Sequence, residues 1–433
     1  MRNIIDGKKK ETRSGRTERR KGARVFTALM LMTALVFTLT GCTTFDNFKR
    51  AFIDKNSADD ADAVYIGVYE PESGEFEQEG KNEIKGIELA NSMYGSFRGA
   101  EIKLIKVDNQ SDIHASKTAI EDLIKLKPVA IIGSAGEMSS MAATKYVQKA
   151  KIPMITPSAS NPLITEGHDY CFRACITDSQ RGEGIVEYMV DKLGASSIGV
   201  VTLKNNSLTS ALMSGFTSKV NSYAGSASIV MKKEYGVDDY EFKGLIKALK
   251  KNKPQAVFMP LGAEKADVIF TKVEKAGLTD IVFIGDKSWN KDDFIKIMKK
   301  HPKIKIAFPA DSVINKNRST KEAVTSETQK FMIEYERKYG DNDMPTSNAL
   351  LGYDAYILVL NAMNNAKSLD PKDVRDALAG ISDLRCVSGV VTFDENGNPI
   401  RPVTICSIEK GEIVSIYTTK TGSESKKLDK IEK

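Results

Sequence analysis

The segment Ser158-Ala159-Ser160 has the residue types best suited to holding a small ligand. It directly follows a short apolar stretch, residues 154–156, that is predicted to be a buried strand, and Asn161-Pro162 then turns the chain away. In open α/β sheets, ligands bind beyond the carboxyl ends of strands, where backbone N–H groups collect. The N–H and hydroxyl of Ser160 could donate to a carboxylate there, and each charge-assisted bond contributes about 1.5–3 kcal/mol. The alternative is an ordinary capping loop, in which Ser and Asn are common.

Residues suited to catalysis form no recognisable pattern. The three histidines, His114, His168 and His301, have no triad or metal partner at a recognisable spacing, and the chain has no Gly-x-Gly-x-x-Gly or P-loop sequence. We therefore predict three surface histidines and a protein that is not an enzyme and has no cofactor and no metal site.

Cys42 closes the sequence Leu39-Thr40-Gly41-Cys42, after a basic leader and the uncharged stretch 25–39. That stretch is shorter than the roughly 20 residues of a membrane-spanning helix, and the whole pattern is typical of an export signal. It resembles a bacterial lipobox, in which Cys42 would be diacylated and become the N-terminus. An uncleaved anchor helix is the alternative. Both predict an extracytoplasmic protein held at the cell membrane.

The charge of the chain is concentrated in this leader. The chain carries 63 basic and 57 acidic residues, a net charge of +6. Residues 1–41 alone carry +7, which leaves −1 for the remainder. The basicity therefore gives no support for a nucleic-acid partner.

Short β-branched runs alternate with helical patterns from residue 64 onward, which predicts parallel sheets covered by helices. A break at residues 161–179 suggests that one such array ends there and a second begins. The predicted strands are 64–69, 102–108, 129–133, 154–156, 198–202, 228–234, 256–260 and 281–285. The predicted helices are 82–93, 115–126, 139–150, 182–193, 211–223, 241–251 and 264–276.

The pattern changes after residue 308. Helices are predicted at 320–339, 347–366 and 371–379, followed by a hairpin with arms 387–393 and 403–408. Cys386 and Cys406 would lie near one another in that hairpin, either as a disulfide or as two buried thiols. The tail, residues 419–433, is rich in Lys, Ser and Glu and is predicted to be disordered.

Several of these segments resemble, in order and spacing, the substrate-binding lipoproteins of ABC importers, specifically the branched-chain amino-acid-binding (leucine/isoleucine/valine-type) family. The segments that carry the resemblance are Ile66-Gly67-Val68-Tyr69-Glu70-Pro71, Asp108-Asn109-Gln110-Ser111-Asp112, Ile131-Ile132-Gly133, Ile152-Pro153-Met154-Ile155-Thr156-Pro157-Ser158-Ala159-Ser160-Asn161-Pro162, Phe172-Arg173, Gly352-Tyr353-Asp354-Ala355 and Ser388-Gly389 with Phe393-Asp394-Glu395-Asn396-Gly397.

The resemblance implies an α/β fold with two doubly wound parallel-sheet lobes joined by three crossings, the type I periplasmic binding protein fold. The crossings would fall near Asp178, Asp311 and Arg401. The predicted organisation is a signal peptide (1–41), a tether (42–62), a first lobe (63–177 and 312–401), a second lobe (178–311 and 402–418) and the tail (419–433).

The resemblance also assigns binding residues. Ser158, Ala159 and Ser160 match the positions that hold the ligand's carboxylate, and Asp286, at the end of strand 281–285, matches the acidic position that accepts its ammonium. Trp289 is expected either to wall the pocket or to pack in the core.

Three binding positions depart from the family pattern. Glu137 stands where relatives usually have a carboxylate-binding Ser, Glu79 where an aromatic residue often covers the ligand, and Leu208 where a Tyr is usual. Glu137 would repel an amino acid's carboxylate unless it swings out or is protonated. Ser139 and Ser140 could replace it or could only cap their helix. Four further acidic residues of the first loop are expected to be solvated: Glu70, Glu72, Glu75 and Glu77.

The function that the resemblance implies is capture of a small amino-acid-like ligand between two lobes and its delivery to an ABC permease. The protein is expected to be a monomer, with the permease subunits and the membrane as partners. Ser160 and Asp286 would bias closure by binding from opposite lobes. One alternative is a ligand-sensing ectodomain that serves a chemoreceptor or kinase. The other is a binder of a more cationic or polar solute, such as an amine or amide.

Overall fold

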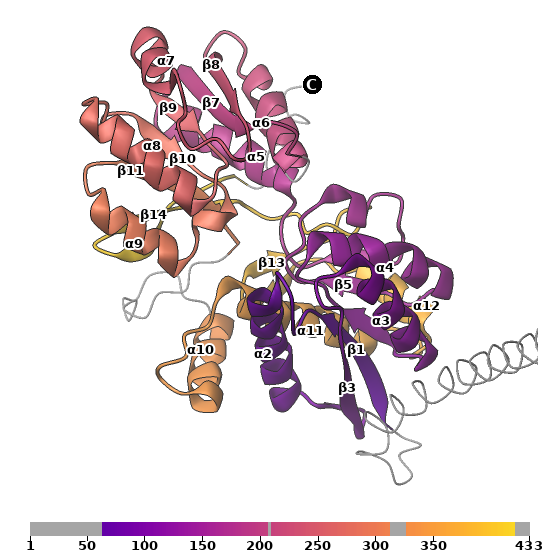
Figure 1. The fold of residues 1–433 in the computed structure, drawn as a ribbon. Helices are drawn as coiled ribbons and strands as arrows, with labels where there is room; N and C mark the ends of the chain where they lie inside the picture. The colour runs from indigo at the N-terminus through magenta and orange to yellow at the C-terminus, as the bar shows by residue number, and fades with distance from the viewer. Residues whose placement is uncertain (1–62, 207–208, 312–325, 421–433) are drawn as a thin grey trace, which may run out of the picture. The chain divides into compact units, whose positions relative to one another are not determined.

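The computed structural model describes residues 63–206, 209–311 and 326–420 (Figure 1). From Ala63 onward the chain forms one compact unit. The predicted signal peptide, Cys42, the tether and Leu208 lie outside the described residues, as does the predicted tail beyond Lys420. Within the described residues, no helix is both long and apolar enough to cross a membrane.

The first sheet has the strand order β2-β3-β1-β4-β5-β6. All its neighbouring strands pair in parallel except β2, which is antiparallel to β3. The three residues of β4 are completely buried, as expected for a parallel sheet covered on both faces. The strands are β1 (Val64–Glu70), β2 (Ser96–Phe97), β3 (Ala100–Asp108), β4 (Ala130–Ile132), β5 (Met154–Thr156) and β6 (Cys171–Arg173).

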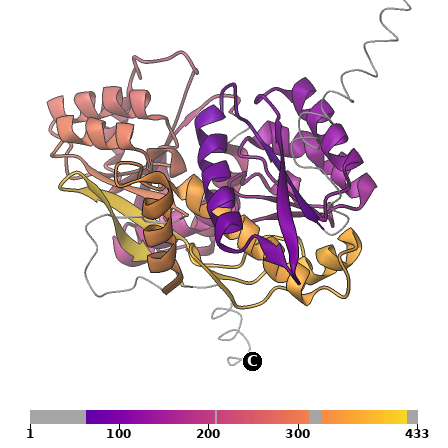
Figure 2. The ribbon, with the colours of Figure 1, turned by 90° about the horizontal axis from the view of Figure 1, so that it is seen from below.

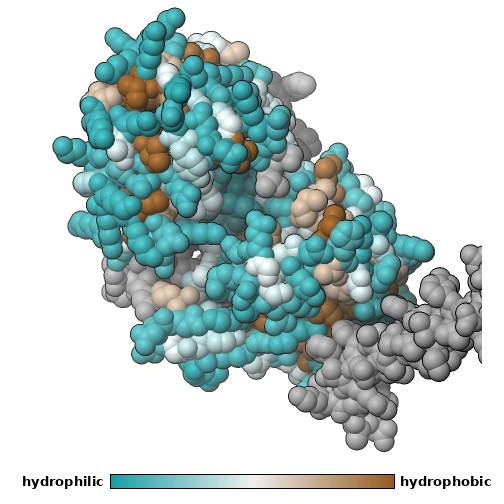
Figure 3. All heavy atoms as spheres, in the orientation of Figure 1, coloured by the Kyte–Doolittle hydropathy of each residue, from teal (hydrophilic) through white to brown (hydrophobic). Residues whose placement is uncertain are grey.

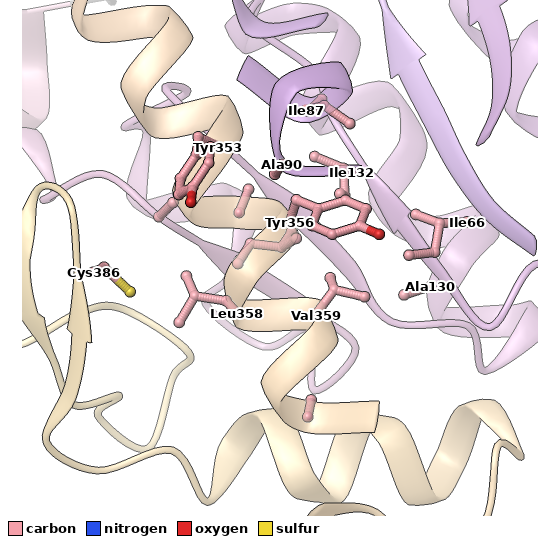
Figure 4. Packing of buried hydrophobic residues seen from close by; sticks show 14 of the residues in the cluster. Ile66, Ile87, Ala90, Ala130, Ile132, Tyr353, Tyr356, Leu358, Val359 and Cys386 are labelled. Atoms are coloured by element: carbon pink, nitrogen blue, oxygen red, sulfur yellow. The ribbon is translucent and has the colours of Figure 1, made fainter. Parts of the chain in front are cut away.

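Six helices accompany this sheet: α2 (Glu77–Met93), α3 (Ile113–Lys125), α4 (Glu137–Ala150), α10 (Ser326–Tyr339), α11 (Ser347–Asn365) and α12 (Pro371–Ala379). Tyr353, Tyr356 and Val359 of α11 belong to one buried cluster with Ile66 of β1 and Ile132 of β4 (Figure 4). Helices α2 and α11, far apart in sequence, lie side by side (Figures 1 and 2). We call this sheet and its helices the first lobe.

The second sheet has the order β15-β14-β11-β10-β9-β7-β8. Strands β8, β7, β9, β10 and β11 are parallel, and β14 and β15 are antiparallel additions at one edge. The strands are β7 (Ser197–Leu203), β8 (Ser228–Tyr235), β9 (Ala256–Phe258), β10 (Val282–Ile284), β11 (Lys305–Ala310), β14 (Thr404–Glu409) and β15 (Glu412–Thr418).

The helices of this second lobe are α5 (Asp178–Glu187), which continues into a π-helical turn (Tyr188–Lys192), α6 (Ser210–Ser222), α7 (Leu245–Asn252), α8 (Ala263–Lys275) and α9 (Asp292–Lys300). Two parallel-dominated sheets with helices confirm the predicted α/β class. The described surface in Figure 3 is mainly polar, with small separate apolar areas.

The predicted turn at residues 394–398 forms, with an antiparallel bridge between Phe393 and Pro399, but the predicted pairing of the two arms is wrong. The first arm contains β13 (Gly389–Val391), which pairs with the preceding strand β12 (Leu384–Cys386). The second arm is β14, which joins the second sheet by pairing with β11. Asp354 of α11 accepts hydrogen bonds from the N–H groups of Val387 and Ser388, which fixes the first arm in the first lobe. Cys386 and Cys406 are therefore in different sheets, and both are buried thiols that form no disulfide with one another.

Candidate functional site

The loop of residues 158–161 lies at the carboxyl end of β5, as predicted, and is held from inside the first lobe. The buried guanidinium of Arg173 donates to the carbonyl oxygens of Ala159 (3.1 Å) and Asn161 (2.7 Å). The Ala159 N–H donates to Thr156 Oγ1. These bonds use the interior-facing groups of the loop and fix its shape.

Glu137, the first residue of α4, supplies the acceptor for the donors of this loop. Its Oε1 accepts from the backbone N–H of Ser160 at 2.9 Å and from Ser160 Oγ at 3.1 Å. Its Oε2 accepts from the backbone N–H of Asn161 at 2.9 Å. The carboxylate thus bonds the donors that the sequence assigns to a ligand's carboxylate, and it does so without swinging out.

Ser139 and Ser140 do not take over the position of Glu137. Ser139 Oγ accepts from Ser116 Oγ, and Ser140 Oγ exchanges hydrogen bonds with the backbone of Ser134. Both are buried. Ser140 thereby holds the loop before α4 in place, and Ser139 joins α4 to α3.

Lys287 reaches this loop from the second lobe. Its Nζ donates to Ser160 Oγ at 2.8 Å and to the carbonyl oxygen of Ser158 at 3.2 Å, and lies 3.8 Å from Glu137 Oε1. Burial and the nearby Arg181 lower the pKa of Lys287, but Asp178 and Glu137 raise it by more, so the pKa is above its ordinary value. A charged ammonium therefore lies beside the Glu137 carboxylate.

The segment that carries Lys287 makes two more contacts with the first lobe. Lys291 forms an ion pair with Glu79 at 2.8 Å, and Asn290 Nδ2 donates to Ser347 Oγ at 3.0 Å. Glu79 therefore faces the second lobe. Its partner here is a lysine of the protein.

Asp286 caps a short turn. Its Oδ1 accepts from the backbone N–H of Ser288 at 2.8 Å, at the start of the 3₁₀ turn Lys287–Trp289. Burial raises its pKa, while the hydrogen bonds from Ser288 counteract part of that rise. It is the neighbouring Lys287 that contacts the 158–161 loop.

Trp289 packs in the core of the second lobe. It is 0% exposed, its ring stacks on Phe294 at 4.3 Å between centroids, and its Nε1 donates to the Leu261 carbonyl at 2.7 Å. Gly285 leaves room for the ring, because a Cβ there would lie 2.1 Å from it. The structure supports the core alternative for this residue, since a buried ring offers no surface to a ligand.

Glu70 and Glu83 form a buried carboxyl pair behind the loop, and the expectation that Glu70 is solvated is wrong. Both are 0% exposed. Glu70 Oε2 accepts from the Ala135 N–H, and Glu83 Oε1 accepts from Ser158 Oγ and from Asn348 Nδ2. Among the described residues, the remaining oxygens, Glu70 Oε1 and Glu83 Oε2, are buried without a hydrogen-bond partner. Burial raises the pKa of Glu83 to about 7, and burial together with the neighbouring Glu83 raises the pKa of Glu70 well above its ordinary value. One proton held between the two carboxyls would give both orphaned oxygens a partner.

The three predicted crossing positions meet in one ionic network. Arg181, 1% exposed, bonds Asp178 at 2.8 Å and Asp311 at 2.7 Å. Arg401 lies 3.9 Å from Asp311 and donates to the carbonyl oxygen of Ala174 at 2.8 Å. Burial alone would raise the pKa of Asp311, but Arg181, Arg401 and Lys287 lower it below its ordinary value.

Sequence reasoning missed the roles of Lys287, Arg173 and Glu83. Lys287 directly follows Asp286, the strand-end residue that the resemblance assigns to the ligand's ammonium. Among the described residues, no group of three or more His, Cys, Asp or Glu is placed to hold a metal ion.

Comparisons with known proteins place the chain in a family. The sequence profile described as "Periplasmic binding protein" matches residues 63–412. An amino acid binding protein of Pseudomonas aeruginosa is 30% identical over 143 residues, covering 32% of this chain and 38% of that protein. A leucine-, isoleucine-, valine-, threonine- and alanine-binding protein of the same organism is 23% identical over 354 residues, covering 78% of this chain and 87% of that protein.

A solved structure is similar over the same region. The branched-chain amino acid transporter substrate-binding protein of Streptococcus pneumoniae, in complex with isoleucine, aligns with a TM-score of 0.68 and 26% identity. The alignment covers 83% of this chain and 99% of that one. Because the family profile spans most of the chain, this protein belongs to the periplasmic binding protein family.

Proposed function

We propose that this protein is an extracytoplasmic solute-binding protein that captures a small polar solute between its two lobes and delivers it to an ABC importer. The observation that carries the proposal is the meeting of Lys287, from the second lobe, with Ser158 and Ser160 of the first. Loops at the carboxyl ends of β5 and β10 thereby face one another, as binding of one solute from both sides requires.

The comparisons support this proposal. The relatives named above are described as binders of amino acids, and one belongs to a branched-chain amino acid transporter. The proposed role is binding and delivery, with no chemical step. Cys42 is proposed to carry the lipid that keeps the protein at the membrane, and permease subunits are the proposed partners.

The experiment uses the purified protein in two measurements. Native mass spectrometry would detect a solute that stays bound through purification, and thermal unfolding would be measured with a panel of amino acids, amines and carboxylic acids. A bound solute should raise Tm. At a solute concentration of 100 times Kd, the free energy of unfolding should increase by about 2.7 kcal/mol. A protein that retains no solute and responds to no compound of the panel would contradict the proposal.

Closure and anchoring have separate tests. Small-angle scattering should show compaction with the bound solute, and Ser160→Ala should reduce it; compaction unaffected by Ser160→Ala would remove Ser160 from the mechanism. Cys42→Ala should move the protein from the membrane to the soluble fraction, and an unchanged membrane fraction would contradict lipidation.

A further inference from the structure

The backbone N–H groups of Ser160 and Asn161 and the Ser160 hydroxyl are already hydrogen-bonded within the protein. Three hydrogen bonds join Glu137 to the Ser160 N–H, the Ser160 hydroxyl and the Asn161 N–H. Arg173 uses the carbonyl oxygens of Ala159 and Asn161. A ligand carboxylate would have to displace the Glu137 carboxylate or lie beside it, and like charges at that distance repel.

The acceptors of the same loop are held less firmly than its donors. They are occupied by the ammonium group of Lys287, whose side chain is long and partly exposed. Lys287 Nζ donates to the Ser158 carbonyl and to Ser160 Oγ, and it lies 3.8 Å from Glu137 Oε1. Its side chain is 39% exposed, whereas Ser160 is 0% exposed. A flexible lysine can withdraw into solvent and leave these acceptors to another ammonium group.

The charges around the loop also favour a ligand with an ammonium group. Glu137, Asp178 and Glu79 are carboxylates near or facing the contact between the lobes, and the Glu70–Glu83 pair adds a further negative charge behind Ser158. Lys287 and Lys291 are the cations that the second lobe brings to them. Asp178 is already paired with Arg181, so the carboxylates that face the second lobe's lysines are Glu137 and Glu79. An ammonium that replaces Lys287 keeps the pairing with Glu137, whereas an anion there would face that carboxylate directly.

We propose that the site binds a primary amine that carries no carboxylate beside its amino group, and that Glu137 and Lys287 determine this choice. The inference rests on the proposed function and adds the ligand class. Glu137 takes the place of a ligand's carboxylate, and Lys287 competes with the ligand's ammonium for one set of acceptors.

The experiment compares pairs of compounds that differ only by a carboxylate: leucine with 3-methylbutylamine, ornithine with putrescine, and arginine with agmatine. Titration calorimetry on the purified protein should give tighter binding of the amine than of the amino acid in each responding pair, by at least about tenfold, since a charge-assisted contact is lost or opposed. 4-Methylpentanoate, a carboxylate without an amine, should not bind.

Two variants test the assigned residues. Glu137→Ser frees the Ser160 and Asn161 donors, so it should reverse the preference toward the amino acid of each pair. Lys287→Met removes the internal competitor and should tighten amine binding. Glu137→Gln keeps the shape but not the charge, and should weaken amine binding without admitting amino acids.

Controls and outcomes separate this inference from the proposed function. Glu75→Ser and Lys296→Met make the same changes at exposed positions and should leave the preference unchanged. Tighter binding of amino acids than of amines by the unchanged protein would overturn the inference and leave the proposed function standing. If no amine binds but the mass spectrum shows another bound solute, the inference is likewise overturned and the proposed function stands. A protein that binds nothing would overturn both.

Discussion

Arg181 Nη2 lies 2.7 Å from each of the two carboxylate oxygens of Asp311. Arg181 is in α5, just after the chain leaves β6 of the first lobe, and Asp311 directly follows β11 of the second. The pair therefore links two of the passages of chain between the sheets, where it is almost completely buried.

Removing this ion pair should destabilise the fold. Arg181→Met leaves Asp178 and Asp311 without their shared cation, and breaking a buried pair costs about 3–5 kcal/mol. The free energy of unfolding, from urea denaturation, measures the loss. Arg337→Met is the matched control, because that side chain is 75% exposed and forms a surface ion pair with Glu334; it should change stability by less than about 0.5 kcal/mol. Equal effects of the two variants would contradict a structural role for Arg181.

The Glu70–Glu83 pair should make stability fall as the pH rises. The folded pKa of Glu83, about 7, is above that of an unfolded Glu, near 4.3, so the folded state binds more protons between these values. The contribution of the pair is complete below about pH 4.3 and is lost as the pH rises through the folded pKa.

Glu70→Gln tests this pH dependence. A glutamine can still accept from the Ala135 N–H and can donate an N–H to Glu83 in place of the shared proton. The variant should be more stable than the unchanged protein at pH 8 and should differ little from it at pH 5, by urea unfolding at both values. Glu75→Gln, at an exposed position, is the control. A constant difference at both pH values would contradict the shared proton.

Gly352→Ala should weaken the packing of α2 against α11. A Cβ at Gly352 would lie 2.3 Å from the Glu83 carbonyl oxygen, which is backbone and cannot rotate away. The helices must separate, so we expect a loss of about 1–3 kcal/mol, measured by thermal or urea unfolding. Gly236→Ala adds the same methyl where no atom of the described residues lies within 4 Å, and should have little effect. Unchanged stability of Gly352→Ala would show that the helices adjust freely.

His301 should stabilise the second lobe, and the prediction that it lies on the surface is wrong. It is 5% exposed, with Nε2 2.7 Å from Asp267 and Nδ1 2.8 Å from Glu274. His301→Phe leaves both carboxylates without this partner and should cost about 1–3 kcal/mol. His114→Phe, at an exposed position, should be nearly neutral. Equal unfolding midpoints for the two variants would contradict this role.

Local sequence determined most of the elements that support the site. The buried strands β4 and β5 and the helices α3, α4 and α8 were predicted within a few residues, because a doubly covered parallel sheet needs continuous apolar runs and its helices need a 3.6-residue period. The 158–161 loop was placed correctly for the same reason, since it follows a strand directly. The hairpin after α12 was predicted wrongly, because alternating apolar residues do not say which of two sheets a strand joins.

Only the tertiary structure decided which charges meet. Lys287 and Ser160 are 127 residues apart, and Glu70 and Glu83 become a pair only when β1 and α2 pack together. A charged side chain is stable in either water or a paired interior, so its residue type alone does not reveal its environment. The sequence identified the strand-end loops of both lobes, and the fold determined that Glu137 and Lys287 occupy the contact between them.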